Sequence, residues 1–296
     1  MFKLNIIEIL PQSFKLVFSQ LPLFGKTVVV PLVASGAAAL AIAYLLGVNR
    51  TSTSAETFQG DMEGIQNLPP QERLQSTLDL LVGVGIVETL LFALCTLILS
   101  VPCAAAWHRI TQQGAAQLSS EDLTFKFGPM ERTYLKYRMV IHLGFFCGIF
   151  LAQAVVTVVL GMISAPGLLA MAATVVILVI LAARAVRASL VLAATAVGDQ
   201  MTLRGARELG KGAGGEMLMI AILIHIPFFF LIFIVELFVN SLVANLDFAF
   251  TQSVVTLAAN GAMVLLIDAV VIAAVSQIYM QLKKSGSQQA GRGQTE

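Results

Sequence analysis

The sequence predicts an all-α, polytopic membrane protein with six transmembrane helices arranged as three hairpins. The first observation is composition: 57% of the 296 residues are hydrophobic and 12% are charged, with a mean hydropathy of +0.86. The second is the placing of the basic residues, which fall almost entirely in alternate connections between apolar segments. A water-soluble domain carries about twice this share of charged residues, so the composition excludes a soluble fold.

Six apolar segments are long enough to cross a bilayer, because a hydrocarbon core about 30 Å thick requires roughly 20 helical residues. Pro102 and Pro227 lie inside two of them, and we expect local kinks at both prolines. The predicted spans are residues 27–48, 80–106, 139–163, 168–190, 216–243 and 253–281. Together they define one transmembrane domain, residues 27–282.

The orientation follows from the lysine and arginine residues, which are retained preferentially on the cytoplasmic side of a membrane. Of the 18 such residues, all except Arg50 and Arg73 lie on one predicted side, at the two termini and around the connections after the second and fourth spans. Both termini should therefore be cytoplasmic. Trp107, His108 and Arg109 end the second span, where an aromatic and a basic residue would anchor the helix in the headgroups.

Most segments outside the spans are predicted to be cytoplasmic. Residues 1–26 form a cytoplasmic or interfacial segment, within which residues 10–24 carry apolar side chains at helical spacing; this predicts either an interfacial amphipathic helix or a helix packed beneath the bundle. Amphipathic stretches also precede the third and fifth spans, and Thr202 is expected to cap the second of these, residues 199–209. Residues 49–79 form the sizeable external connection. Residues 283–296 are rich in Gly, Ser and Gln and are predicted to form a disordered cytoplasmic tail.

One stretch resembles a known group of proteins. The segment 187–198, RASLVLAATAVG, is followed by residues 201–204 and a glycine-rich lead into the next span. This pattern resembles uncharacterised bacterial six-span inner-membrane proteins, which are similar to the membrane domain attached to some glycerophosphodiester phosphodiesterases. The resemblance implies the hairpin architecture and a bacterial inner membrane. In such families the hydrolase is a separate soluble domain, so no catalytic residue is carried over.

Polar side chains at membrane depth are the candidate functional residues, because an ionised group there is costly and normally faces the bundle interior or water. On the fifth span His225 and Glu236 share one face within about 20°, and His142 and Gln153 repeat this spacing on the third. The candidate polar path comprises Glu88, Glu236, Asp268, His225, His142, Gln153 and Asn240.

Depth along the helices limits which of these groups can pair. Glu88 would pair with Glu236, and Asp268 with His225. Two interpretations are open. In the first, the residues line a path for proton-coupled transport. In the second, each carboxyl is neutral and simply hydrogen-bonded across helices. The lack of a duplicated charged motif or a broken-helix pair in the sequence favours the second.

Basic residues cluster at the predicted cytoplasmic ends of the fourth and fifth spans. Topological anchoring explains their position, and contact with anionic lipid headgroups is also expected, since each basic residue near the surface is worth about 1 kcal/mol. The candidate lipid contacts are Arg184, Arg187, Arg204, Arg207 and Lys211.

Recognised catalytic and cofactor motifs are missing from the sequence. It contains no His-Glu-x-x-His helix, Gly-x-Ser-x-Gly elbow or phosphate-binding loop. Cys95, Cys103 and Cys147 fall in apolar runs and indicate neither disulfides nor a metal site. We therefore expect no catalytic residue, metal or cofactor. Nucleic-acid binding is not expected either, because the basic loops lack interleaved aromatic residues.

The expected function is that of a non-enzymatic integral inner-membrane protein, which organises membrane lipids or a membrane-protein partner and can form a homo-oligomer. The alternative is a permease for a small substrate or lipid that uses the intramembrane carboxylates and His225 as its polar path. An intramembrane enzyme is the third interpretation, and the sequence offers no motif that supports it.

Overall fold

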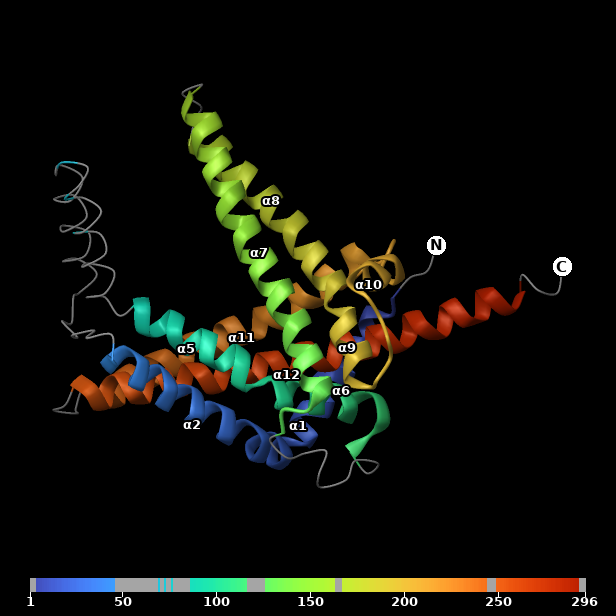
Figure 1. The fold of residues 1–296 in the computed structure, drawn as a ribbon, viewed down its shortest axis with the longest axis horizontal. Helices are drawn as coiled ribbons and strands as arrows, with labels where there is room; N and C mark the ends of the chain where they lie inside the picture. Colours follow the sequence, from blue (N-terminus) through green and yellow to red (C-terminus); the bar gives the residue numbers. More distant parts are fainter. Residues whose placement is uncertain are drawn as a thin grey trace. The chain divides into compact units, whose positions relative to one another are not determined.

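The structure, a computed structural model, describes residues 4–45, 69, 72, 76, 86–115, 126–162, 167–243 and 249–292. Within these ranges the secondary-structure elements are helices and no strand occurs (Figure 1). The predicted external connection, residues 49–79, lies almost entirely outside the described residues. The helices are α1 (Ile6–Ser19), α2 (Leu21–Leu45), α5 (Ile86–Leu99), α6 (Val101–Gln113), α7 (Pro129–Met162), α8 (Gly167–Ala188), α9 (Leu190–Ala196), α10 (Leu203–Leu209), α11 (Gly214–Val243) and α12 (Ala249–Arg292).

Helices long and apolar enough to span a membrane are present, as the sequence predicts. In the described part of the chain, five helical segments are long and apolar enough to cross a membrane, and a sixth is added if α5 and α6 form one span bent by 47°. Pro102, the second residue of α6, explains the bend, because proline lacks the N–H and clashes with the carbonyl one turn earlier. The five are Leu21–Ala38, Pro129–Val156, Met171–Ala196, Gly214–Val239 and Ala258–Ser285.

The chain forms two compact units, and each is described by itself. The first contains Met1–Thr27, Val101–Ile234 and Met263–Glu296; the second contains Val28–Ser100 and Val235–Ala262. In the second unit, a Cβ placed on Gly261 of α12 would lie 2.6 Å from Phe92 Cζ and 2.7 Å from Leu32 Cδ1. Glycine at this position therefore leaves room for the Phe92 and Leu32 side chains against the backbone of α12.

In the first unit, α7 and α8 lie side by side and expose long apolar faces (Figure 1). Phe150 and Leu151 are among the exposed residues of α7, as Val175 and Val176 are on α8. Exposed apolar faces of this length suit a hydrocarbon solvent and would be costly in water. The short helix α9, by contrast, is buried along its whole length, as expected for a helix that is apolar all round.

The N-terminal segment is a packed helix rather than one that only lies on a surface. Ile9, Ser13 and Val17 of α1 are fully buried, and the Phe14 ring stacks on Phe228 of α11 with their centroids 5.8 Å apart. The second of the two predicted alternatives, a helix packed against the bundle, describes this face of α1. The opposite face remains open, since Ile7 is 88% exposed.

The C-terminal segment differs from its prediction. The structure continues α12 as a helix to Arg292, where the sequence predicts a disordered tail over residues 283–296, of which residues 293–296 lie outside the described part. The physical reason is cooperativity: extending a helix that already exists costs far less than starting one. The predicted Thr202 cap is confirmed, because its Oγ1 accepts a hydrogen bond of 3.1 Å from the Gly205 N–H.

Candidate functional site

A polar stripe on α12 connects this helix to its neighbours in the first unit. The stripe consists of Asp268, Ser276, Tyr279 and Lys283, which fall within an arc of about 80° at 100° per residue. Each of the four side chains contacts a polar group from another part of the unit. We refer to these four residues as the α12 stripe and treat it, with its partners, as the candidate site.

Asp268 forms an ion pair with Arg138 of α7. The Arg138 Nη2 donates to the Asp268 carboxylate at 2.7 Å, and the two side chains are 7% and 37% exposed. The predicted pairing of Asp268 with His225 is therefore wrong. His225 lies on the exposed face of α11, where its Nδ1 donates to the Ala221 carbonyl of its own helix at 2.7 Å. A nearby guanidinium satisfies a carboxylate better than an imidazole does, because it offers a fixed charge.

Ser276 contacts His108 of α6 deeper in the same core. The His108 Nδ1 and the Ser276 Oγ are 2.6 Å apart, and both side chains are completely buried. The Tyr134 ring packs against the imidazole with centroids 5.7 Å apart. A serine and a histidine at this distance resemble a nucleophile and its base, but catalysis also requires access for a substrate. The burial of this pair therefore favours a structural role.

Trp107 and His108 do not form the headgroup anchor that the sequence predicts. Trp107 is 1% exposed; its Nε1 donates to Thr27 Oγ1 at 3.4 Å, and its ring lies 6.0 Å from that of Phe24. The anchor prediction is wrong because α6 is buried along most of its length and the Trp107 ring lies against the start of α2. Arg109 is also withdrawn, 3.5 Å from Glu131.

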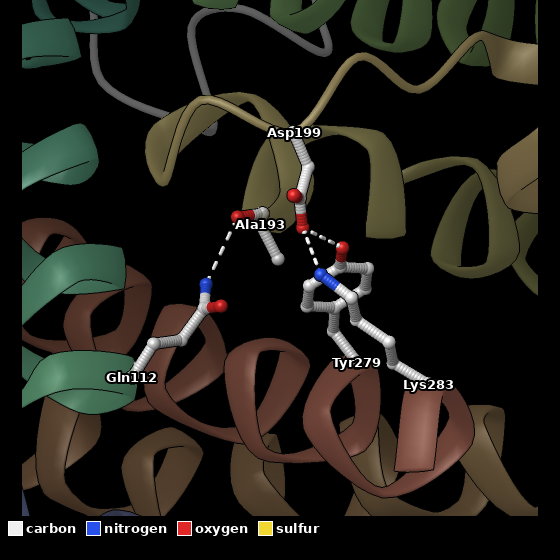
Figure 2. A network of polar contacts seen from close by, with 5 residues as sticks. All are labelled: Gln112, Ala193, Asp199, Tyr279 and Lys283. Carbon is white, nitrogen blue, oxygen red and sulfur yellow. Dashed lines mark hydrogen bonds and ion pairs between the residues drawn. The ribbon is translucent and has the colours of Figure 1, made fainter. Parts of the chain in front are cut away.

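The turn that follows α9 directs the Asp199 side chain toward α12. Gly198 has φ of +82°, a left-handed conformation that only glycine adopts without cost. The Asp199 N–H donates back to the Ala194 carbonyl at 3.0 Å, which ends the helix and turns the carboxylate toward α12 (Figure 2). On the other side, Gln112 Nε2 donates to the Ala193 carbonyl at 2.9 Å. The end of α9 is thus held by α6 as well as by α12.

Asp199 is the acceptor for the last two residues of the α12 stripe. Its Oδ2 accepts from the Lys283 Nζ at 2.5 Å and from the Tyr279 hydroxyl (Figure 2). The hydrogen bond from Lys283, followed by that from Tyr279, holds the pKa of Asp199 below its ordinary value of 3.8. A depressed pKa means that the folded state favours the ionised carboxylate. We refer to this three-residue contact as the Asp199 latch.

The Asp199 latch predicts how the stability of the fold depends on pH. Because the pKa of Asp199 is lower in the folded state, its contribution to stability is present above pH 3.8 and is lost as the pH falls through the folded value. Lys283 and Asp199 are 60% and 36% exposed, so solvent screening limits the contribution to about 1 kcal/mol. Asp199→Asn should therefore lower the melting temperature at neutral pH, and its difference from wild type should shrink in strong acid. Thermal unfolding across pH measures this, with the exposed Glu208→Gln as control; a difference independent of pH would contradict it.

The structure does not bring the predicted polar path together in the part it describes. His142 Nδ1 donates to the Arg138 carbonyl at 2.8 Å, and the exposed Gln153 accepts from Thr174 of α8 at 2.9 Å. Glu236 is exposed on α11. The side chains of Glu88 and Asn240 lie outside the described residues, and the predicted pairing of Glu88 with Glu236 stays a prediction.

The predicted basic cluster is located on α8, α10 and the turn that follows α10. Arg184, Arg204, Arg207 and Lys211 are exposed, and Arg187 lies against the glycine-rich turn before α11. Within the described residues, no group of three or more His, Cys, Asp or Glu side chains could hold a metal ion.

Sequence reasoning missed several residues of the site. The sequence predicts only a topological role for Arg138, although this residue begins the apolar part of α7 and is 5% exposed. Ser276, Tyr279 and Asp199 are not among the candidate residues predicted from the sequence. A signal did exist, because Asp268, Tyr279 and Lys283 recur at helical spacing on one side of the last span.

Comparison with known proteins does not assign the chain to a family. The resemblance to phosphodiesterase-linked membrane domains thus stays a prediction from a short sequence pattern. No protein-family model, curated protein or solved structure matches the chain.

Proposed function

We propose that this chain is a non-enzymatic integral membrane protein that organises a membrane-protein partner. The observation that carries the proposal is the position of His225. This residue is exposed near the middle of the candidate span Gly214–Val239, on a helix face that is otherwise apolar. A polar group at this depth is normally turned toward other protein rather than toward lipid.

The face around His225 is suited to a second helix. A shallow, open depression lies on one face of α11, and we refer to it as the groove on α11. Its lining repeats at helical spacing and consists of Ala221, Ile222, His225, Ile226, Phe229 and Phe230. Exposed apolar residues extend the same face further along the helix, among them Phe233 and Leu237. Aromatic and aliphatic residues in successive turns are the usual contacts of a transmembrane helix that lies in a groove.

The histidine also indicates what the partner should provide. Its Nδ1 is bonded within α11, and its Nε2 makes no hydrogen bond to any residue that the structure describes. Lipid tails offer no hydrogen-bonding group. A partner helix with a carboxyl, hydroxyl or amide at mid-depth would form a hydrogen bond with the imidazole. If the partner is instead a second copy of this chain, the mass of the complex shows it.

Removing the His225 hydrogen bond should release the partner. An interhelical hydrogen bond in a membrane is worth about 1 kcal/mol, so His225→Leu should weaken the affinity for the partner about fivefold and lower its occupancy. Phe229→Ala, which removes an aromatic contact beside it, should do the same. Native mass spectrometry of protein extracted gently from its own membrane measures the occupancy.

A matched control is available on α7. Phe150 is 75% exposed and Phe229 is 71% exposed, so Phe150→Ala removes the same side chain from a different apolar face. We expect Phe150→Ala to retain the partner at the wild-type stoichiometry. If all three variants keep the partner equally, or if the wild type is purified as a single chain, the groove on α11 does not bind a protein.

The location and topology form part of the same proposal. We propose a bacterial inner membrane, six spans in three hairpins and two cytoplasmic termini. The restriction of nearly all 18 basic residues to one predicted side supports the orientation. The five helices that can cross a membrane, with the bent pair α5 and α6, support the number of spans.

A permease remains the second candidate, and the α12 stripe favours it. Asp268 and Ser276 place a carboxylate and a hydroxyl at successive depths of one helix, each with a partner on another helix. Proton-coupled carriers need such polar groups within the bundle. Measurement of flux in proteoliposomes tests this candidate: pH-dependent flux that survives Glu88→Gln, Glu236→Gln and Asp268→Asn together would exclude the proposed path.

A further inference from the structure

The basic cluster contains one arginine whose side chain is held in place. Arg187 lies near the end of α8, and its Nε donates to the Ala183 carbonyl at 3.3 Å. A Cβ placed on Gly210 would lie 3.0 Å from Arg187 Cγ, and one placed on Gly214 would lie 3.1 Å from its Cδ and Nε. Glycine at both positions therefore allows the arginine stem to lie directly against the turn between α10 and α11.

The charged end of this side chain is not used within the protein. The Nη1 and Nη2 atoms of Arg187 form no hydrogen bond or ion pair with the residues that the structure describes. The stem of this arginine is held, and its two terminal nitrogens remain available. Such a guanidinium is preorganised for a planar, bidentate contact with a phosphate or carboxylate. Because little side-chain entropy remains to be lost, such an arginine binds an anion more strongly than a mobile one.

The surroundings of Arg187 favour an anion. Arg204 and Arg207 are separated by one helical turn on α10, Lys211 follows one turn later, and α10 packs against α8. All three side chains are exposed and form no ion pair with described residues. Two carboxylates lie nearby in sequence: Glu208 is exposed on α10, whereas Glu216 of α11 accepts the Leu4 N–H at 2.8 Å. The net charge of this surface is therefore positive.

The depth of this surface identifies the source of the anion. Arg187 closes the apolar part of α8, whose exposed residues run from Leu169 to Ile180, and the next helix, α9, is buried in the protein. The end of such an apolar face coincides with the headgroup region of a bilayer. We propose that Arg187, bonded to the Ala183 carbonyl and lying against Gly210 and Gly214, is a binding site for the phosphate of an anionic lipid headgroup, supported by the positive charge of Arg204, Arg207 and Lys211 on and after the adjacent helix α10.

This site is separate from the groove on α11 that we propose for a partner. It involves different side chains and a different class of ligand, so loss of one leaves the other measurable. It also goes further than an anchoring role for the basic residues. Simple anchoring requires positive charge at the interface, whereas the proposed site requires that the Arg187 side chain be held in one position.

A pair of neighbouring glycines separates these two roles. Gly214→Ala would displace the Arg187 side chain, while a Cβ on Gly215 meets nothing within 4 Å. Both are the opening residues of α11, both substitutions keep every charge, and alanine favours the helix in each case. The full-length protein would be titrated in detergent with phosphatidylglycerol or with phosphatidylcholine, and native mass spectrometry would count the bound lipids.

We expect phosphatidylglycerol to bind the wild type and Gly215→Ala equally, and Gly214→Ala about threefold more weakly. Arg187→Ala should weaken binding about tenfold, the loss expected for a charge-assisted contact. Arg187→Lys keeps the positive charge but loses the two-pronged guanidinium, so its affinity for phosphatidylglycerol should lie between those of the wild type and Arg187→Ala. The exposed Arg132→Ala on α7 serves as a control for the loss of one charge and should bind as the wild type does.

Other outcomes would overturn the site. Equal binding by Gly214→Ala and Gly215→Ala, in protein with unchanged melting temperature, would leave only non-specific attraction. If Arg132→Ala and Arg187→Ala weaken lipid binding equally, the attraction is again non-specific. If inorganic phosphate alone binds Arg187 and displaces phosphatidylglycerol at equal concentration, the site takes a free anion and the assignment to a lipid headgroup is wrong.

Discussion

Replacing Arg138 by methionine should lower the free energy of unfolding by about 3 kcal/mol, the largest loss expected from a single charged residue in this chain. The substitution leaves the Asp268 carboxylate near a membrane-spanning core without its guanidinium partner, 2.7 Å away in the wild type. Removal of one member of a buried pair is costly because the remaining group must be desolvated without compensation. The partial exposure of Asp268, 37%, places the expected loss at the lower end of the range for such pairs.

The protein carries its own probe for this measurement. Trp107 is the one tryptophan of the sequence and is buried against Phe24 and Thr27, so its fluorescence should report unfolding of the first unit in detergent. Arg132→Met, an exposed change on the same helix, is the matched control. In the double variant Arg138→Met with Asp268→Leu, most of the lost stability should return. A double variant as unstable as the single one would show that Arg138 acts through contacts other than Asp268.

Truncation of Trp107 should be the second large loss, at about 3–5 kcal/mol for Trp107→Ala. The side chain fills the space between α6, the start of α2 and the Phe24 ring, and little of its surface reaches solvent. A cavity of this size cannot close without moving α6, which is itself buried on both sides of the residue. Thermal unfolding followed by circular dichroism measures the loss, since this variant has no tryptophan fluorescence.

A milder variant distinguishes the buried position from a headgroup anchor. Trp107→Phe keeps most of the packing and removes the weak hydrogen bond to Thr27, so it should cost well under half as much as Trp107→Ala. A tryptophan located in the headgroups would tolerate both changes with losses below about 1 kcal/mol. A water-soluble quencher should also fail to reduce the Trp107 emission of the native protein.

The sequence predicts the helices of this protein better than it predicts their contacts. Hydrophobicity over some 20 residues is a local property, and the predicted spans overlap the candidate segments, although some ends differ by about ten residues, as for 139–163 against Pro129–Val156. The position of α9 is not local. Its seven residues, six of them apolar, continue the hydrophobic run of α8, and only the turn at Ser189 and the packing on α6 show that they belong to the protein core.

The candidate site was hard to predict for a related reason. Periodicity identified polar residues on each helix but could not show which face of α11 meets other helices, so His225 was assigned to the interior and is exposed. For Arg138 the error is the reverse, because a residue predicted to lie in an exposed connection is buried. Its charge indicated a cytoplasmic connection, whereas the helix α7 begins at Pro129 and carries the guanidinium into the bundle. Both errors arise because tertiary packing decides burial after the helices have formed.

Because α12 is continuous from Ala249 to Arg292, we expect the protein to respond to the thickness of its bilayer. At 1.5 Å per residue, Asp268 and Lys283 are about 22 Å apart on one rod, with an ion pair at one end and the Asp199 latch at the other. A helix longer than the local hydrocarbon adjusts by tilting. If α12 tilts by about 10°, Lys283 moves sideways by about 4 Å relative to Asp268. This displacement is larger than the length of a hydrogen bond. A thinner or thicker membrane would therefore strain one of the two contacts unless α7 and the end of α9 follow the tilt.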